Sequence, residues 1–312
     1  MIVWLMVAPV AASVSLGCGA PALRRSLSPA RAATMLTALA VITALATGLV
    51  LCVAAALAFT QLSSVAEDGG WSAAAMAGWQ RVPSVVGVGA GLLAAGLMSV
   101  ACGRAVRVAR QLRRTSRACR FLGAEVAGLV VVDDDRSGAF AVPGRRGRTV
   151  VTRGLLRRLD GPERRALLAH EAAHLRDRHV VHVQLSALAA VGNPMLRPVA
   201  RAVRLAVESS ADEEAARVVG DREVVARTLA KAALARAGLA TPAGALAASD
   251  VSELRVRVDS LLDGERRRRP VVAAVFTAVV ALAAACALVV ASGAHAAFEH
   301  AEHVTTVVAE TR

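Results

Sequence analysis

Two histidines and a glutamate in the second half of the chain have the types and spacing of a metal site. His170 and His174 lie four positions apart, so on a helix they share one face and both imidazoles can bind one Zn²⁺ at about 2.0–2.1 Å. Glu171 borders that face and can reach a water on the metal, as a general base must. This HExxH pattern therefore predicts metal-assisted hydrolysis with Zn²⁺ as the cofactor.

A third ligand is expected further along the chain, because a catalytic zinc takes three protein ligands and leaves one position open. Glu208 and Asp212 are again four apart, and an antiparallel return of the chain would bring Glu208 to the two histidines. We predict Glu208 as the third ligand and Asp212 as a carboxylate that orients a ligand histidine. The alternative is a solvated acidic turn of helix, since Glu213 and Glu214 follow directly.

Other histidines compete for this role. His179 follows His174 by five residues, which turns it off the ligand face, and His182 returns to that face two turns further along. We expect both to line the cavity or to be structural. A further set near the C-terminal end shares one helical face and comprises His295, Glu299 and His303. We favour a solvated helical extension over a metal-binding tail for this set.

The elements that carry these residues can be placed from local signals. Asp160 predicts an N-cap, and Glu163 three residues later completes a capping box ahead of the motif. Asn193-Pro194 interrupts the helical pattern before the second set of carboxylates. The segment 224–262 indicates further helices, and we assign no chemistry to it.

A β-like pattern precedes the motif. Three short apolar runs at 129–132, 139–142 and 149–152 are separated by turn residues and predict a small antiparallel sheet. An edge strand there, over 139–143, would hold a peptide substrate in extended form.

Composition places this site in a membrane protein. The 312 residues are 55% hydrophobic with a mean hydropathy of +0.51, and the excess lies in four blocks that are each long enough to cross a bilayer. These blocks are 2–20, 35–59, 84–103 and 271–292. They exclude an ordinary soluble enzyme, a disordered chain and a disulfide-rich secreted module. We expect the first block to be a retained span, the alternative being a signal peptide.

Charge predicts how the spans are oriented. The net charge is +13, and basic residues gather after the first block and between the third and fourth. The positive-inside rule therefore puts 104–269 in the cytoplasm and both chain ends outside. Arginines spaced along 104–120 fit contact with anionic headgroups better than a nucleic-acid arm, because no aromatic side chains accompany them for base stacking. Gly87 and Gly91 in the third block fit close helix packing.

The predicted fold class is a mainly α integral membrane protein. We expect four transmembrane helices, with a cytoplasmic zincin-like α+β peptidase segment between the third and the fourth. The predicted division is 1–103 for three spans with short loops, 104–269 for the peptidase domain, and 270–312 for the fourth span and a short extracytoplasmic tail.

The motifs resemble those of the BlaR/MecR-type membrane metallopeptidases. The likeness consists of HEAAH at 170–174, an Asn-Pro before the next helix, ESSAD at 208–212, and the layout of the spans, and it extends over about 20–292. The related HtpX-type peptidases share HExxH and ExxxD. The resemblance implies zinc as the cofactor, Glu171 as the catalytic acid/base, and three zinc ligands, namely His170, His174 and Glu208.

One departure from that family concerns sensing. The members that sense β-lactams carry a penicillin-binding domain after the last span, whereas a short tail without an SxxK motif follows it here. We expect any inducing signal to arrive by another route.

Three functions are therefore in competition. The first is a zinc endopeptidase in the membrane that cleaves a cytoplasmic protein, such as a repressor of the BlaI/MecI type, or itself, in signal transduction. The second is HtpX-like quality control of membrane proteins. The third is a non-catalytic scaffold or signal relay with a structural zinc, which would have no need of Glu171. The predicted partners are the lipid bilayer and a protein substrate, without direct nucleic-acid contact.

Overall fold

The computed structural model describes residues 2–79, 81–118, 125–126, 128–135, 138–142, 147–237, 244–264 and 270–310. The elements before the sheet are the helices α1 (Ile2–Ser26), α2 (Pro29–Thr60), α3 (Ser63–Gly69), α4 (Ala73–Trp79) and α5 (Ser84–Ala118). The sheet consists of β1 (Glu125–Val126), β2 (Leu129–Val132), β3 (Ala139–Val142) and β4 (Arg148–Thr152). The remaining elements are α6 (Arg153–Arg158), α7 (Gly161–Arg176), α8 (His179–Gly192), the 3₁₀ turn η2 (Pro194–Leu196), α9 (Arg197–Val219), α10 (Arg222–Ala237), α11 (Gly244–Leu262) and α12 (Pro270–Glu310).

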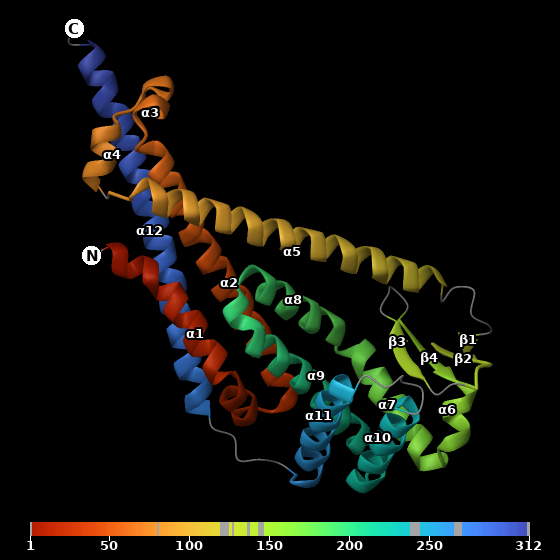
Figure 1. Ribbon diagram of the computed structural model, residues 1–312. Helices are drawn as coiled ribbons and strands as arrows, with labels where there is room; N and C mark the ends of the chain where they lie inside the picture. Colours follow the sequence, from red (N-terminus) through yellow and green to blue (C-terminus); the bar gives the residue numbers. More distant parts are fainter. Residues whose placement is uncertain are drawn as a thin grey trace.

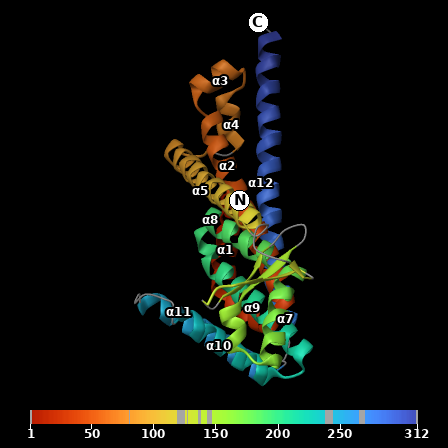
Figure 2. The ribbon, with the colours of Figure 1, turned by 90° about the vertical axis from the view of Figure 1, so that its right-hand side faces the viewer.

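Four helices contain stretches long and apolar enough to cross a membrane, as the sequence predicts. These stretches are Leu5–Ser26, Pro29–Thr60, Ser84–Ala118 and Pro270–His303. Helices α1, α2 and α12 run side by side, while α5 leaves this bundle and extends toward the sheet (Figures 1 and 2). By length and composition the chain fits a multi-pass membrane protein. Which side of the membrane each end occupies stays a prediction.

Glycines let α5 approach α2. A Cβ added to Gly87 would lie 1.9 Å from the Cβ of Ala58, and one added to Gly91 would lie 3.3 Å from the Cβ of Ala55. The predicted role of these two glycines in close helix packing is thereby confirmed.

The sheet is mixed, so the prediction of an antiparallel sheet is wrong in one pairing. The strand order is β1-β2-β4-β3, with β2 parallel to β4 and β3 antiparallel to β4. The three predicted strand positions are correct. Strand β4 takes the centre because Thr149, Val150 and Val151 are all buried, whereas β3 exposes Phe140 and lies at the edge.

Helices α8 and α9 form a hairpin that packs against the bundle (Figure 1). One hydrophobic cluster joins Leu16 and Leu36 of the bundle to Val199 and Val203 of α9 and to Val280 of α12. This cluster draws on all three segments of the predicted division at 103 and 269. The division itself stays a prediction.

Helices α10 and α11 pack against the two helices that carry the HExxH and ESSAD segments. They pack on α7 and α9 through a second cluster that includes Ala166, Ala215, Val225, Leu229 and Leu261. Helices α9 and α10 pack against α7, which carries the HExxH segment, and the sheet also contacts α7 (Figure 1).

Candidate metal centre

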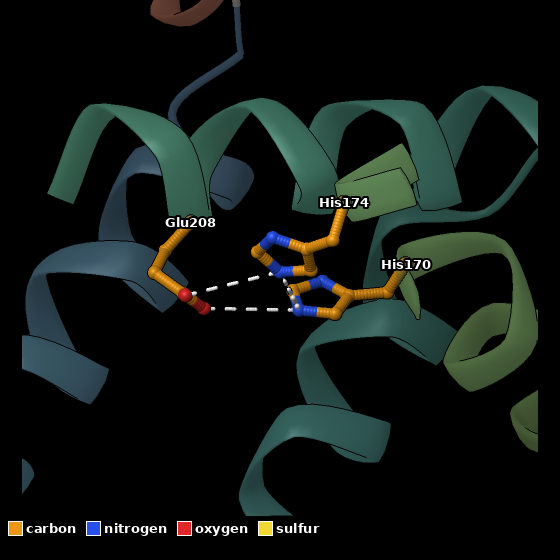
Figure 3. Close-up of side chains that lie close together, drawn as sticks. All are labelled: His170, His174 and Glu208. Atoms are coloured by element: carbon orange, nitrogen blue, oxygen red, sulfur yellow. Dashed lines mark hydrogen bonds and ion pairs between the residues drawn. The ribbon is translucent and has the colours of Figure 1, made fainter. Parts of the chain in front are cut away.

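Helices α7 and α9 bring the three predicted ligands together (Figure 3). The Nε2 atoms of His170 and His174 are 3.1 Å apart, and Glu208 oxygens lie 3.7 Å from the first and 3.8 Å from the second. In a tetrahedral zinc site, bonds of about 2.0–2.1 Å place ligand atoms about 3.3 Å apart. Two imidazole nitrogens and a carboxylate that converge at these distances fit Zn²⁺ in donor type and spacing.

Local interactions fix the start of the helix that carries the histidines. The amide of Glu163 donates to the Asp160 side chain at 2.9 Å, and the amide of Asp160 donates to the Glu163 side chain at 3.0 Å. The predicted capping box is therefore confirmed. Glu163 is also paired with Lys231 of α10 at 2.6 Å, so the cap is tied to a neighbouring helix.

Glu171 lines the same cleft as the three candidate ligands. The cleft has a volume of about 960 Å³ and is bordered by the end of α5, by β3, by α8 and by α10. The residues of the edge strand β3 that line it are Ala139, Phe140 and Ala141. Glu171 is thus placed where a general base is expected, and its catalytic role stays a prediction.

Each histidine has a partner behind it, on the nitrogen that faces away from Glu208. His170 Nδ1 lies 3.0 Å from Asp212 Oδ1, and His174 Nδ1 lies 3.0 Å from His179 Nδ1. Such partners fix which ring nitrogen is free to bind a metal. Asp212 therefore occupies the position predicted for an orienting carboxylate, and its orienting role stays a prediction.

The competing histidines take other positions. His179 lines the cleft behind His174, as expected for a cavity residue, and does not join the cluster of potential ligands. Within the described ranges, neither His182 nor the set His295, Glu299 and His303 takes part in a group of three ligand residues. In the tail, His295 lies 3.4 Å from Glu299.

Arg257 on α11 is a site residue that the sequence analysis missed. Its guanidinium forms a bidentate pair with Asp212, at 2.8 and 2.7 Å, and also lies 3.0 Å from Glu208. One signal could have found it: Arg257 shares a helical face with Leu254, Val258 and Leu261, which pack into the core. An arginine among core positions needs a buried acidic partner.

Burial and these partners set the charge of the site. Burial lowers the pKa of His174 to about 3, so its imidazole is neutral at pH 7, as metal binding requires. Burial alone would also lower the pKa of His170, but Asp212 outweighs it and raises that pKa. Burial would raise the pKa of Asp212, yet the two hydrogen bonds from Arg257 and the close contact with the His170 ring keep it below its usual value. Asp212 is therefore an anion in the interior.

Part of the chain matches a known protein family. Residues 104–192 match the model of Peptidase family M48. The matched segment includes HEAAH at 170–174 and ends before Glu208. No curated protein and no solved structure matches the chain. The matched segment is under a third of the chain, and it supports an M48 family metallopeptidase. Peptidases of this family depend on a metal, in agreement with the three-residue cluster.

Proposed function

We propose that this protein is a zinc-dependent endopeptidase of the membrane that cleaves a cytoplasmic protein. The family match and the four apolar helices indicate a membrane metallopeptidase. The observation that carries the proposal is the convergence of His170, His174 and Glu208 in one cleft with Glu171. A structural zinc site would leave no task for that glutamate, which disfavours the scaffold alternative.

The residues divide the chemistry among them. His170, His174 and Glu208 would hold zinc, which when bound polarises a carbonyl and lowers the pKa of water. Glu171 accepts the proton of the attacking water and passes it to the leaving amine. Asp212 and His179 hold the two imidazoles in orientation from behind.

Strand β3 supplies a binding edge for the substrate. It is an edge strand of the sheet, and three of its four residues line the cleft. An extended peptide that pairs with this edge would lie alongside His170 and Glu171 and would present its backbone carbonyls to the site. This arrangement selects unfolded or extended segments and not helices.

The substrate and the topology belong to the proposal as well. The basic residues between the third and fourth spans support a cytoplasmic site with both chain ends outside. The resemblance to BlaR/MecR-type peptidases supports a repressor of the BlaI/MecI type, or the chain itself, as the substrate. Cleavage of many misfolded membrane proteins would instead support the HtpX-like role.

Metal content tests the site. Zinc measured by mass spectrometry on the detergent-purified chain should be about one per chain, and the His174→Ala variant should lose it. His300→Ala is a matched control, since His300 is exposed in the tail and the variant should keep its zinc. A folded wild-type protein that binds no zinc after resupply would refute the proposal.

Substitution of Glu171 tests the chemistry. Glu171→Gln should keep the zinc and lose cleavage by about 10²–10⁴-fold, because a general base contributes that much. Proteins that accumulate uncut in cells carrying the variant are the candidate substrates. A single repressor supports signalling, and a broad set of membrane proteins supports quality control. Unchanged processing in the variant would exclude the endopeptidase function and favour the non-catalytic scaffold.

A further inference from the structure

The hairpin of α8 and α9 packs beside the apolar stretches of α1 and α2. Its tip is formed by Asn193 and η2 and lies against α1 and α2 (Figure 1). Leu196, Val199 and Val203 are fully buried there against Leu16 and Leu36. One face of the tip is therefore packed into the bundle, while Pro194, Met195 and Arg197 are exposed on its other side.

A polar contact joins the tip to two spans. The Asn193 side-chain amide donates to Ser13 Oγ at 2.7 Å and to Thr47 Oγ1 at 3.2 Å. Asn193 is 4% exposed and Ser13 is 0% exposed. Ser13 lies near the middle of the stretch Leu5–Ser26, and Thr47 lies near the middle of Pro29–Thr60. An amide left unpaired at that depth is costly, so this contact holds the tip at one position.

A glycine brings α1 onto the same tip. A Cβ added to Gly17 would lie 2.6 Å from the carbonyl oxygen of Met195, which is backbone and cannot turn aside. The close approach therefore requires glycine at this position. Gly48 follows Thr47 on α2 and has open space where a Cβ would be, so it differs from Gly17 in this one respect.

Both arms of the hairpin lead to the metal centre. Helix α8 begins at His179, whose ring contacts the ring of His174, and just two residues separate α8 from α7. Helix α9 leads from the tip to Glu208 and continues to Asp212. Helices are stiff over such lengths, so a shift of the tip moves Glu208 relative to the histidines of α7.

We propose that α8, η2 and α9 form a membrane-inserted hairpin, and that Asn193 and Gly17 are positioning residues for the metal centre. The contact at the tip fixes the hairpin on α1 and α2, and the two arms then set Glu208 opposite His170 and His174. A displacement of α1 against α2 is transmitted to the centre by the same route. This inference rests on the function proposed above and adds the way in which the spans control it.

The coordination geometry tests the positioning role. Co²⁺ replaces zinc in the full chain in lipid nanodiscs, and its visible absorption reports the ligand arrangement. Asn193→Ala and Gly17→Ala should change the spectrum and weaken zinc binding by about 10-fold, as loss of a supporting residue does. Ser13→Ala removes one of the two contacts and is the milder variant if the others fail to fold. Thr37→Ala and Gly48→Ala are the controls, because Thr37 Oγ1 bonds to the backbone of its own helix.

The outcomes separate this inference from the proposed function. A wild-type chain that binds neither Co²⁺ nor zinc refutes the function itself. A wild-type chain that binds both, with hairpin variants identical to it in spectrum and affinity, refutes the positioning role alone. Changes confined to the hairpin variants, with Thr37→Ala and Gly48→Ala unaffected, support it.

Depth is measured separately. A spin label at Met195→Cys, in a chain whose native cysteines are replaced, should collide with oxygen more often than with a water-soluble nickel chelate. The same label at Arg255 on α11, whose side chain is 83% exposed, should collide with the nickel chelate more often than with oxygen. More frequent collisions with the nickel chelate than with oxygen at position 195 would overturn the membrane insertion of the tip.

Discussion

Helices α7 and α11 both contribute to the metal centre, but they are held in different ways. Helix α7 has a capping box at its start, an ion pair with α10 and buried contacts along α9. Helix α11 reaches the centre through Arg257, while its residues Val251 and Leu262 are exposed. Helix α7 is therefore positioned by its own sequence and by its packing. Helix α11 is held by the apolar contacts of Leu254, Val258 and Leu261 and by long-range ion pairs to α9, and Arg257 is the residue that tests the ion pairs.

Among the substitutions that test this difference between α7 and α11, removal of Arg257 should lower the free energy of unfolding most. Arg257→Met leaves the Asp212 carboxylate buried, at 1% exposure, without its bidentate partner. We expect the free energy of unfolding to fall by about 3–5 kcal/mol, the cost of breaking a buried pair from one side. Thermal unfolding of the metal-free protein in detergent measures this, so that loss of zinc does not contribute.

A matched control lies two residues away. Arg255 is 83% exposed and 3.8 Å from Asp259, so Arg255→Met should leave the unfolding midpoint unchanged within error. Equal stability of Arg257→Met and Arg255→Met would mean that α11 is peripheral to the centre. The comparison with α7 would then lose its basis.

The same difference explains what the sequence could predict. The shared faces of His170 with His174 and of Glu208 with Asp212 follow from the 3.6-residue period of a helix, and the capping box follows from the residue types at its start. Arg257 joins the centre through packing of α11 on α9, and no local pattern encodes which helix it will meet. The parallel pairing of β2 with β4 was missed for a similar reason. Strand β3 pairs on the far side of β4 and leaves β2 to pair in parallel with β4, an order that no local pattern encodes.

The local support of α7 should have an intermediate effect. Asp160→Ala removes one half of the capping box, and we expect a loss of about 1 kcal/mol, typical of an N-cap. Ser28→Ala is the control, because Ser28 is the N-cap of α2 but its side chain makes no capping hydrogen bond. Thermal unfolding compares the two variants. A larger loss in Ser28→Ala would contradict the role given to the cap.

The smallest effect is expected at a second ion pair between α9 and α11. Arg204 and Glu253 lie 2.7 Å apart, with side chains 53% and 35% exposed. This pair joins the same two helices as Arg257 and Asp212 and differs from them chiefly in burial. Because water and salt screen it, a double-mutant cycle with Arg204→Ala and Glu253→Ala should give a coupling energy of about 0.2–1 kcal/mol, decreasing with salt. A coupling as large as the loss in Arg257→Met would show that the α9–α11 contact itself, and not burial of the charge, determines how firmly α11 is held at the metal centre.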